Sequence, residues 1–416
     1  MGAVQTPERL AKSGKQRIIA VIGPAFVAAI AYVDPGNVAA NVSAGARFGY
    51  LLVWVLVLAN LMAAVVQYLS AKLSLVTGRS LPELLGDRLP RVGRILFWVQ
   101  AELIAAATDL AEVVGGAIAL QLLFNLPLLL GGLIVGGVSL VLLAVQSRHG
   151  ERTFEYVTMG LLLIITIGFV AGLFVSPVDW GDVAGGLVPR FEGSQSVLLA
   201  ASMVGATVMP HAIYLHSSVS RDRHGISTDP ARIRRLLHVN KWDVGSAMLV
   251  AGSVNVAMLL LAAASLPGVT GADTIEGAHS AIVNSLGAGI GVIFAIGLLA
   301  SGLASTSVGA FAGASIMQGL LRVRVPLLAR RIVTLIPALI ILGIGVNPTW
   351  ALVLSQVFLS IGIPFALIPL AWYTSRKQIM EGFVNGAAMR VTVAVVAMAI
   401  VVLNVLLLWL LFTGQG

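Results

Sequence analysis

Long apolar segments, separated by short polar connections, run along the whole chain. A helix needs about 20 apolar residues to cross a bilayer, and the pattern predicts eleven such spans. Several are longer than that minimum, which allows tilt or extension beyond the membrane. The predicted bounds are 18–48 (broken), 51–76, 95–124, 127–145, 155–175, 196–219 (broken), 243–266, 286–319, 331–346, 350–373 and 390–412. The pattern therefore predicts an all-α polytopic membrane protein with a single transmembrane domain over residues 1–416.

The first span is interrupted by four consecutive residues that do not suit an apolar helix: Asp34, Pro35, Gly36 and Asn37. A charged side chain at the bilayer centre costs at least about 2.5–3.5 kcal/mol, so it persists there mainly for a function. Pro35 and Gly36 also weaken the helix. Broken backbone at membrane depth is tolerated only where it is buried in protein or lines a cavity. We therefore predict a cavity at mid-membrane that holds a cation, with Asp34 and Asn37 facing it.

The sixth span carries a second interruption, where Pro210 lies mid-span between Met209 and His211. Breaks in two spans that lie five spans apart are the sequence sign of an inverted five-plus-five repeat, whose site lies between the two broken helices. An odd number of spans per repeat inverts the second copy automatically. The predicted division is a first repeat at 18–175, an inverted second repeat at 196–373 and an additional helix at 390–412.

The two breaks together offer an uneven set of metal ligands. Asp34 supplies an anionic oxygen, Asn37 a neutral oxygen, an unwound residue such as Ala206 its carbonyl, and Met209 a thioether sulfur. Hard oxygens alone suit Mg²⁺ or Ca²⁺, whereas an added soft sulfur shifts the preference towards transition metals. A methionine in an apolar span usually only fills the core. Its place beside a proline break, opposite a buried carboxylate, favours the ligand role.

Composition supports a membrane protein and narrows its chemistry. Of the residues, 58% are hydrophobic and 11% charged, whereas a soluble domain has about 25% charged residues. The chain has no cysteine, so no thiolate metal site is available. It also lacks the His-Glu-x-x-His, Walker A and Gly-x-Ser-x-Gly patterns. We therefore expect a protein that is not an enzyme and needs no cofactor.

The basic residues predict the orientation of the chain. With the N-terminus inside, the cytoplasmic segments carry 24 of the 26 Lys and Arg residues, and only Arg47 and Arg190 lie outside. Positive charge favours the cytoplasmic side, so we expect a cytoplasmic N-terminus, retained with the first span as its anchor, and a C-terminus outside. Topology accounts for the net charge of +8, and no nucleic-acid partner is expected.

The two broken spans resemble the NRAMP family of divalent-metal transporters, in its bacterial MntH-type branch. The family's Asp-Pro-Gly-Asn pattern stands at residues 34–37, and its Ala-x-x-Met-Pro-His pattern at residues 206–211. The likeness covers essentially the whole chain and continues at residues 108–112, 347–348 and 355–356. Many eukaryotic members have glutamine and serine where this chain has Leu303 and Ala304, a departure that leaves the ligand set unchanged.

The resemblance implies a LeuT-like fold and proton-coupled uptake of Mn²⁺ or Fe²⁺, with Co²⁺, Cd²⁺ and Zn²⁺ as further candidate substrates. It implies that Asp34, Asn37, Met209 and the Ala206 carbonyl are the metal ligands. It also implies that two further residues bind metal during part of the cycle: Ala31 and Gln356. A magnesium-transporting branch of the superfamily lacks this methionine, so Met209 favours the transition-metal branch.

Coupling metal import to protons needs titratable groups. Asp34 is one, since metal binding requires the deprotonated ligand, and His211 is another, since histidine titrates near neutral pH. The third span adds three carboxylates on nearly one helix face, and two arginines begin the ninth span: Glu102, Asp109, Glu112, Arg330 and Arg331. The resemblance implies that they form a polar exit network for protons. A buried ion-pair network that only fixes helix packing is the alternative, and His216 is expected only to pack.

The sequence therefore predicts an H⁺-coupled Mn²⁺/Fe²⁺ importer in the cell membrane of a bacterium, working by alternating access. Its expected partners are the metal ion, the proton and membrane lipid, with no obligatory protein partner. Three alternatives stay open: a Na⁺-coupled symporter of organic solutes, a magnesium transporter and a passive channel.

Overall fold

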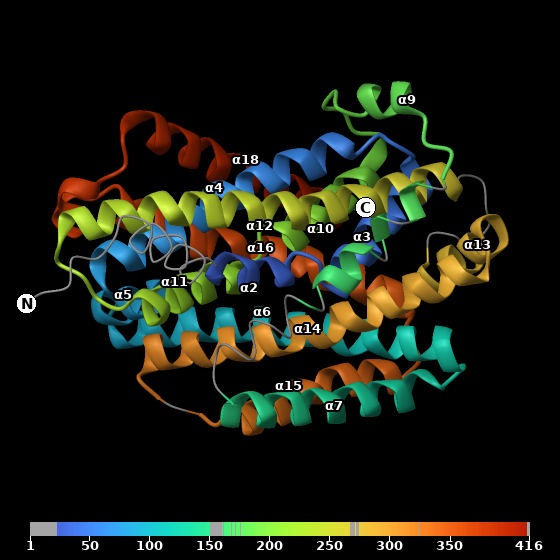
Figure 1. Cartoon of the computed structure of the whole chain (residues 1–416), viewed down its shortest axis with the longest axis horizontal. Coiled ribbons are helices and arrows are strands. Elements are labelled where there is room, and N and C mark those ends of the chain that lie inside the picture. Colours follow the sequence, from blue (N-terminus) through green and yellow to red (C-terminus); the bar gives the residue numbers. More distant parts are fainter. Residues whose placement is uncertain are drawn as a thin grey trace, which may run out of the picture.

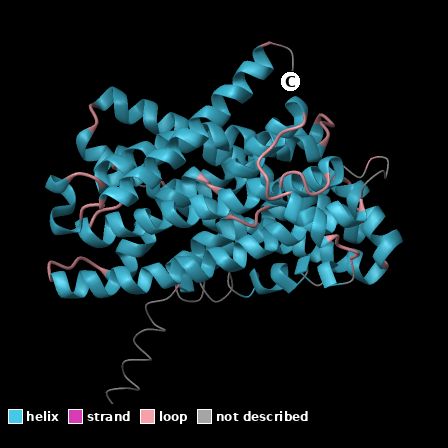
Figure 2. Ribbon diagram, turned by 90° about the horizontal axis from the view of Figure 1, so that it is seen from above, coloured by secondary structure: helices cyan, strands magenta, loops and turns pink. Residues whose placement is uncertain are grey.

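A computed structural model of the chain describes residues 23–149, 160, 162–167, 169–170, 172–174, 176–266, 271, 274–323 and 325–413 (Figure 1). Every regular element within these ranges is a helix, and loops join the helices mainly at the two ends of the bundle (Figure 2). The helices are α2 Pro24–Ala31, α3 Pro35–Phe48, α4 Val53–Thr77, α5 Leu81–Arg88, α6 Arg91–Phe124, α7 Leu128–His149, α9 Trp180–Gly185, α10 Gly193–Thr207, α11 Pro210–His224, α12 Pro230–Ser265, α13 Ile275–Leu286, α14 Ala288–Leu321, α15 Leu327–Gly343, α16 Pro348–Thr374, α17 Lys377–Met380, the 3₁₀ turn η1 Glu381–Phe383 and α18 Ala387–Phe412.

The prediction of an all-α membrane protein is confirmed. Seven helical segments of the described chain are long and apolar enough to cross a membrane. The count of eleven spans stays a prediction. The first span is divided into the short helices α2 and α3, α7 and α15 are shorter or less apolar than that standard, and only part of the span 155–175 lies within the described residues. The division into two inverted repeats also stays a prediction.

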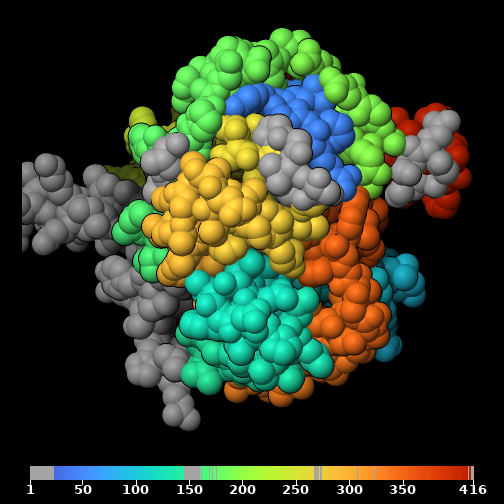
Figure 3. All heavy atoms as spheres, turned by 90° about the vertical axis from the view of Figure 1, so that its right-hand side faces the viewer, coloured from blue at the N-terminus to red at the C-terminus, as the bar shows by residue number. Residues whose placement is uncertain are grey.

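The helices form a layered bundle whose middle layer contains both broken spans (Figure 1). The halves α2 and α3, and the halves α10 and α11, lie among α4, α12 and α16. The long helices α6 and α14 pack against each other on one side of this layer, and α7 and α15 cover them at the edge. At one end of the bundle α13 and the α6–α7 connection lie on the same face (Figure 3). The broken helices are therefore enclosed by continuous ones.

The first break frees backbone carbonyls, and neighbouring helices bind them. The carbonyl of Tyr32 accepts a hydrogen bond from Asn255 Nδ2 on α12 at 2.8 Å. The carbonyl of Val33 accepts one from Ser301 Oγ on α14 at 2.5 Å. Asn41 on α3 holds Asn255 in turn, through its Nδ2 and Asn255 Oδ1 at 3.1 Å. Unpaired backbone groups in an apolar interior are costly, so these side chains stabilise the interrupted helix.

The seventh predicted span begins much earlier than expected. Hydropathy placed its start at residue 243, whereas α12 begins at Pro230. Asp229 caps the helix by accepting from the backbone N of Ala231 at 2.9 Å and of Arg232 at 3.3 Å. Aspartate at the cap and proline at the first position both favour a helix start. Hydropathy identifies the part of a helix that suits lipid, and it does not detect a polar extension.

Three of the basic residues that predicted the orientation are not loop charges. Lys72, Arg330 and Arg331 are buried in the bundle. Lys72 donates to Asn385 Oδ1 at 2.7 Å, and the two arginines form ion pairs with carboxylates of α6. These side chains pair with the protein instead of with lipid headgroups. The orientation therefore depends on fewer charges than the sequence count suggests, and it stays a prediction.

Glycines let α16 approach both breaks closely. A Cβ built on Gly205 of α10 would lie 1.9 Å from the carbonyl oxygen of Gln356, and one built on Gly36 of α3 would lie 1.7 Å from Gln356 Nε2. A larger side chain at Gly205 would meet the backbone of α16 and push this helix away, whereas one at Gly36 would displace the side chain of Gln356. Small residues are the usual means by which membrane helices come into close contact.

Replacing Gly205 by valine is expected to lower the midpoint of thermal unfolding of the purified protein. The new side chain meets backbone, which cannot move aside, and overpacking of this kind costs about 1–3 kcal/mol or more. Gly137→Val on α7 is the matched control, because a Cβ there has no atom within 4 Å. Equal midpoints for the two variants would show that α16 does not pack against α10 this closely.

Candidate metal centre

Asp34 lies at the first break, as the N-cap residue of α3. Its Oδ1 accepts hydrogen bonds from the backbone N of Asn37 at 2.7 Å and from Asn37 Nδ2 at 2.9 Å. The side chain has no solvent exposure. A buried carboxylate needs hydrogen bonds or an opposite charge, and the N-terminus of a helix favours negative charge. The start of α3 therefore stabilises a carboxylate at the break.

Asn37 joins the two breaks to each other. Its Nδ2 donates a second hydrogen bond, to the carbonyl oxygen of Ala206 at 2.8 Å. That carbonyl lies in the last turn of α10, and its usual helical partner would be the N–H of Pro210, which proline lacks. Asn37, at the first break, thus satisfies the backbone carbonyl that the second break leaves without a helical partner. Three predicted ligand residues, Asp34, Asn37 and Ala206, meet within hydrogen-bond distance.

Gln356 brings a third element to the site. It lies on α16, and its Nε2 donates to Asp34 Oδ2 at 3.1 Å. Both oxygens of the carboxylate are therefore bound by side-chain amides. The side chain of Gln356 has no solvent exposure.

Met209 and Ala31 lie at the ends of the half-helices. Met209 is the N-cap residue of α11, directly at the second break, and is fully buried. Ala31 is the last residue of α2, next to the first break, and is also buried. Their positions agree with the predicted ligand set, and their role as ligands stays a prediction.

The amide oxygens of the site lack partners. Asn37 Oδ1 and Gln356 Oε1 are buried and accept no hydrogen bond within the described chain. Each amide directs its NH₂ group at the carboxylate, and a half-turn of each amide would place its oxygen beside Asp34. The result is a set of oxygen donors of the kind that divalent cations take.

A cation at this place depends on one charged ligand and several neutral ones. Within the described ranges, no group of three or more His, Cys, Asp or Glu side chains could hold a metal ion. The site therefore lacks the excess negative charge of a permanent metal centre. What meets at the breaks is one carboxylate with neutral amide groups and one backbone carbonyl.

A second polar cluster links α6 to α15. Arg331 Nη1 lies 2.8 Å from Asp109 Oδ1 and 3.5 Å from Glu112 Oε2. Arg330 Nη2 lies 2.9 Å from Glu102 Oε1. These are the ion pairs that the sequence predicts between the third span and the start of the ninth. Their role as a route for protons stays a prediction.

The charges of this cluster do not balance. Three carboxylates (Glu102, Asp109 and Glu112) face two guanidinium groups, and Asp109, Glu112 and Arg331 are almost completely buried. Asp109 Oδ2 and Glu112 Oε1 have no hydrogen-bond partner in the described chain. An uncompensated charge in an apolar interior is costly. A single proton on one of the carboxylates would remove the excess.

The cluster adjoins the first break. A Cβ built on Gly115 of α6 would lie 2.0 Å from Pro35 Cβ, so this helix packs directly on the start of α3. Glu112 lies one turn before Gly115. His211, the second residue of α11, has its Nδ1 3.3 Å from Thr108 Oγ1, next to Asp109. The same face of α6 therefore contacts residues from both breaks.

A further row of buried, hydrogen-bonded polar side chains was not predicted from the sequence. Gln67 of α4 donates through Nε2 to the hydroxyl oxygen of Tyr32, and its Oε1 lies 2.7 Å from His216 Nδ1. His216 was expected only to pack. The sequence signal that would have revealed this row of side chains is Gln67 itself, a polar residue in the apolar helix α4. Asn255, an amide within the apolar part of the seventh predicted span, carries a similar signal, whereas Ser301 carries none of comparable strength.

Comparison with known sequences identifies the family. Residues 25–410 match the profile of Nramp, described as natural resistance-associated macrophage protein-like. The chain belongs to the Nramp family. It is 60% identical over 394 residues to the divalent metal cation transporter MntH of Mycobacterium tuberculosis, a match that covers 95% of this chain and 92% of the relative. It is 45% identical over 400 residues to the MntH protein of Bacillus subtilis, over 95% and 93% of the two chains.

Solved structures agree with this membership in Nramp. The crystal structure of a histidine-to-alanine mutant of the Eremococcus coleocola manganese transporter superposes with a TM-score of 0.85 at 29% identity, over 96% of this chain and 87% of that one. The structure of MhsT in complex with L-phenylalanine superposes with a TM-score of 0.62 at 15% identity, over 92% and 98% of the two chains. The latter likeness concerns the fold alone, which is the LeuT-like fold that the sequence predicts.

Replacing Arg331 by leucine is expected to destabilise this Nramp protein strongly. The change leaves Asp109 and Glu112 buried without their cation, and removal of one partner of a buried pair costs about 3–5 kcal/mol. The midpoint of thermal unfolding measures the effect. Adding Asp109→Asn to Arg331→Leu should restore part of the loss, since the double variant buries one charge fewer.

Arg234→Leu, at an exposed position of α12, is the control for the loss of an arginine. An unchanged midpoint for Arg331→Leu would mean that these ion pairs contribute nothing to the fold.

Proposed function

We propose that the chain carries Mn²⁺ or Fe²⁺ across the membrane into the cytoplasm, coupled to protons and by alternating access. Nramp proteins are membrane transporters and not enzymes, and the relatives named above are a divalent metal cation transporter and a manganese transporter. The observation that carries the proposal is the bridge of Asn37 between Asp34 and the Ala206 carbonyl. It joins two helix breaks around one buried carboxylate.

In this proposal the metal replaces hydrogen bonds that the site already makes. The amides of Asn37 and Gln356 turn their oxygens towards the ion, and Asp34 supplies the only charge. Hydrogen bonds from neutral amides to the carboxylate are exchanged for metal–oxygen contacts, and no buried ion pair has to be broken. Binding and release can therefore both remain fast.

Met209 supplies the selectivity. A thioether is a soft ligand that Mg²⁺ and Ca²⁺ bind poorly, whereas first-row transition metals accept it. Mg²⁺ also gives up its water reluctantly and needs near-ideal octahedral oxygen ligands. One buried sulfur at the break therefore disfavours Mg²⁺, the competing divalent cation that is abundant in cells. Co²⁺, Cd²⁺ and Zn²⁺ satisfy the same requirement and are further candidate substrates.

Alternating access uses the half-helices. Half-helix α2 ends at the first break, and half-helix α11 begins at the second. Hydrogen bonds from Asn255 and Ser301 hold the loop between α2 and α3. We propose that the ion enters from the side of α3 and α10. Helix α2 then swings about this loop and opens a path to the cytoplasm. Ala31, at the end of α2, would bind the metal during only part of the cycle.

The coupling to protons follows from the charge that the metal site needs. A metal ion binds the deprotonated carboxylate, so a proton on Asp34 must leave as the metal arrives. The α6 cluster next to Pro35 carries one carboxylate in excess of its arginines. We propose that it receives this proton, with His211 beside Thr108 as a relay, and that Arg330 and Arg331 restrain the carboxylates.

The proposed location is the cell membrane of a bacterium, with the N-terminus inside and the C-terminus outside. The asymmetry of basic residues along the sequence supports this orientation. Divalent metal, proton and lipid are the proposed partners.

The selectivity of Met209 is tested by Mn²⁺ uptake into proteoliposomes with an excess of Mg²⁺ outside. We expect the wild type to take up Mn²⁺ despite the Mg²⁺, and Met209→Ala to become sensitive to it, by about tenfold in the inhibiting concentration. Met203→Ala is the matched control, since Met203 is equally buried but lies inside α10, about one turn before its end, and is not a predicted ligand.

If Met209→Ala and Met203→Ala behave alike, the thioether is not the selectivity element. If neither metal moves and an organic solute does, the proposed substrate class is wrong.

Proton coupling is tested with a pH-sensitive dye inside the same proteoliposomes. We expect Mn²⁺ entry into wild-type vesicles to acidify the lumen. Asp109→Asn should retain Mn²⁺ entry with less acidification per metal ion, since the cluster then lacks its excess carboxylate. Asp182→Asn, at an exposed position of α9, is the control. Mn²⁺ entry without acidification in the wild type would instead indicate a uniporter.

A further inference from the structure

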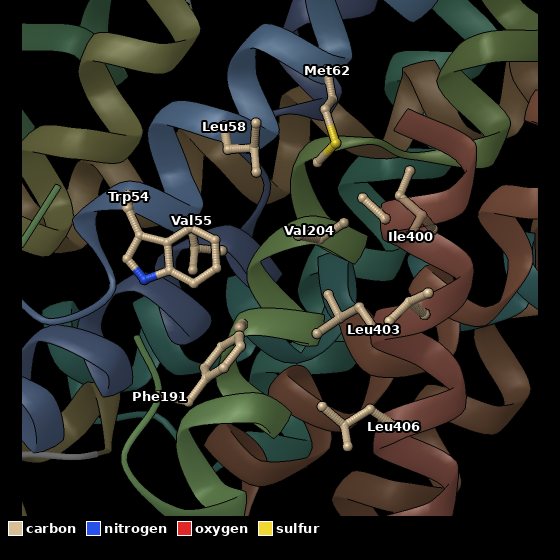
Figure 4. Close-up of a pocket in the computed structure, with 12 residues that line it drawn as sticks. Trp54, Val55, Leu58, Met62, Phe191, Val204, Ile400, Leu403 and Leu406 are labelled. Atoms are coloured by element: carbon tan, nitrogen blue, oxygen red, sulfur yellow. The ribbon is translucent and has the colours of Figure 1, made fainter. Parts of the chain in front are cut away.

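A cavity of about 270 Å³ lies between α4, α10 and α18, away from the metal centre (Figure 4). Its walls are almost entirely apolar. Leu58 and Met62 of α4 face Ile400 and Leu403 of α18 across it, and Val204 of α10 lies behind (Figure 4).

Water is a poor occupant of this cavity. A buried water needs about two to four polar partners, and apolar cavities of about 150 Å³ stay dry and bind apolar molecules. The one side-chain polar group among the labelled lining residues is the indole N–H of Trp54, which already donates to the carbonyl of Arg190 at 3.3 Å. The cavity therefore favours a hydrocarbon.

The cavity opens towards lipid. Helix α18 stands away from the rest of the bundle near the C-terminus (Figure 2), and most of its span is not buried inside the protein. Ala399 and Val402 line the cavity from α18 and are exposed. Leu58, on the opposite wall, is 42% exposed. An acyl chain in the bilayer can enter between α4 and α18 without any change in the fold.

A positively charged residue, Arg190, stands next in the sequence to the lining residue Phe191. Trp54, in the first turn of α4, packs its ring edge-on against Phe191 with 5.4 Å between the ring centroids, and both rings line the cavity. Arg190 precedes Phe191 and is held to Trp54 through its backbone. Its side chain is exposed and forms no ion pair or hydrogen bond within the described part of the chain. Tryptophan at a helix end marks the level of lipid headgroups.

We propose that the cavity binds one acyl chain of an anionic phospholipid, from the leaflet on the α9 side, and that Arg190 binds its phosphate. The apolar walls select the chain, and the guanidinium group selects a negatively charged headgroup. A guanidinium suits phosphate because it offers several N–H donors in a fixed plane.

The lipid would contact a helix that serves the metal centre. Ala200 and Val204 line the cavity from α10, and the same helix ends with the Ala206 carbonyl that Asn37 binds. A chain in the cavity supports α10 from behind. The site is therefore placed to stabilise one position of this half-helix.

Native mass spectrometry of the purified, detergent-solubilised protein tests the site, with dioleoylphosphatidylglycerol and dioleoylphosphatidylcholine as probes. We expect the wild type to bind its first phosphatidylglycerol more tightly than its first phosphatidylcholine. Ala399→Trp fills the cavity from its mouth and should weaken the first binding step for both lipids by at least about tenfold, because several methylene groups lose their buried site. Ala394→Trp, on the same helix but not lining the cavity, is the matched control.

Arg190→Gln tests the headgroup. It should remove the preference for phosphatidylglycerol and leave phosphatidylcholine binding unchanged. We expect that preference to be about fivefold or less, because a single exposed charge pair contributes little. Size-exclusion profiles and unfolding midpoints show whether each variant is folded. None of these measurements depends on transport, so the lipid site is tested separately from the proposed function. The proposal is overturned if Ala399→Trp and Ala394→Trp bind lipid equally well, or if Arg190→Gln keeps the wild-type preference.

Discussion

The hydrogen bonds of Asn37 are the constraint on which the rest of the structure depends. A helix that breaks inside a membrane exposes backbone groups that no water can satisfy. Pro210 deprives the Ala206 carbonyl of its partner, and Asn37 reaches that carbonyl from the other break while it also binds Asp34. The side chain of Asn37 thus connects the two breaks. The long helices that carry Asn255, Ser301 and Gln356 complete the enclosure.

The two polar clusters differ in the kind of bond that they make. Around Asp34 the contacts are neutral amides and carbonyls, which can turn or exchange at modest cost. Around Arg331 they are buried ion pairs, which are costly to separate. This contrast suits a transporter in which the first cluster admits a cation and the second keeps the helices α6 and α15 together. In the proposed mechanism, the one carboxylate in excess is the group of the second cluster that takes up a proton.

The sequence predicted the two breaks and the residues that meet there, because a carboxylate and a proline rarely stand side by side in an apolar span unless the helix is interrupted. It predicted the partners of Glu102 and Asp109 because a carboxylate inside a membrane needs a cation. It did not predict the start of α12 at Pro230, because hydropathy detects lipid-facing residues and not helix caps. It missed Gln67, whose importance depends on which side chains meet it across helices. The apolar cavity beside Trp54 also depends on packing between distant segments, which no local pattern encodes.

The most direct measurement of the central claim is the position of the metal itself. Crystals of the protein soaked in Mn²⁺ would be measured at a wavelength where manganese scatters anomalously. The account predicts one strong peak between the two breaks, at bonding distance from Asp34 and Met209, with the oxygens of Asn37 and Ala206 directed at the ion. A peak at another place, or none at saturating Mn²⁺ in a structure with intact breaks, would contradict it.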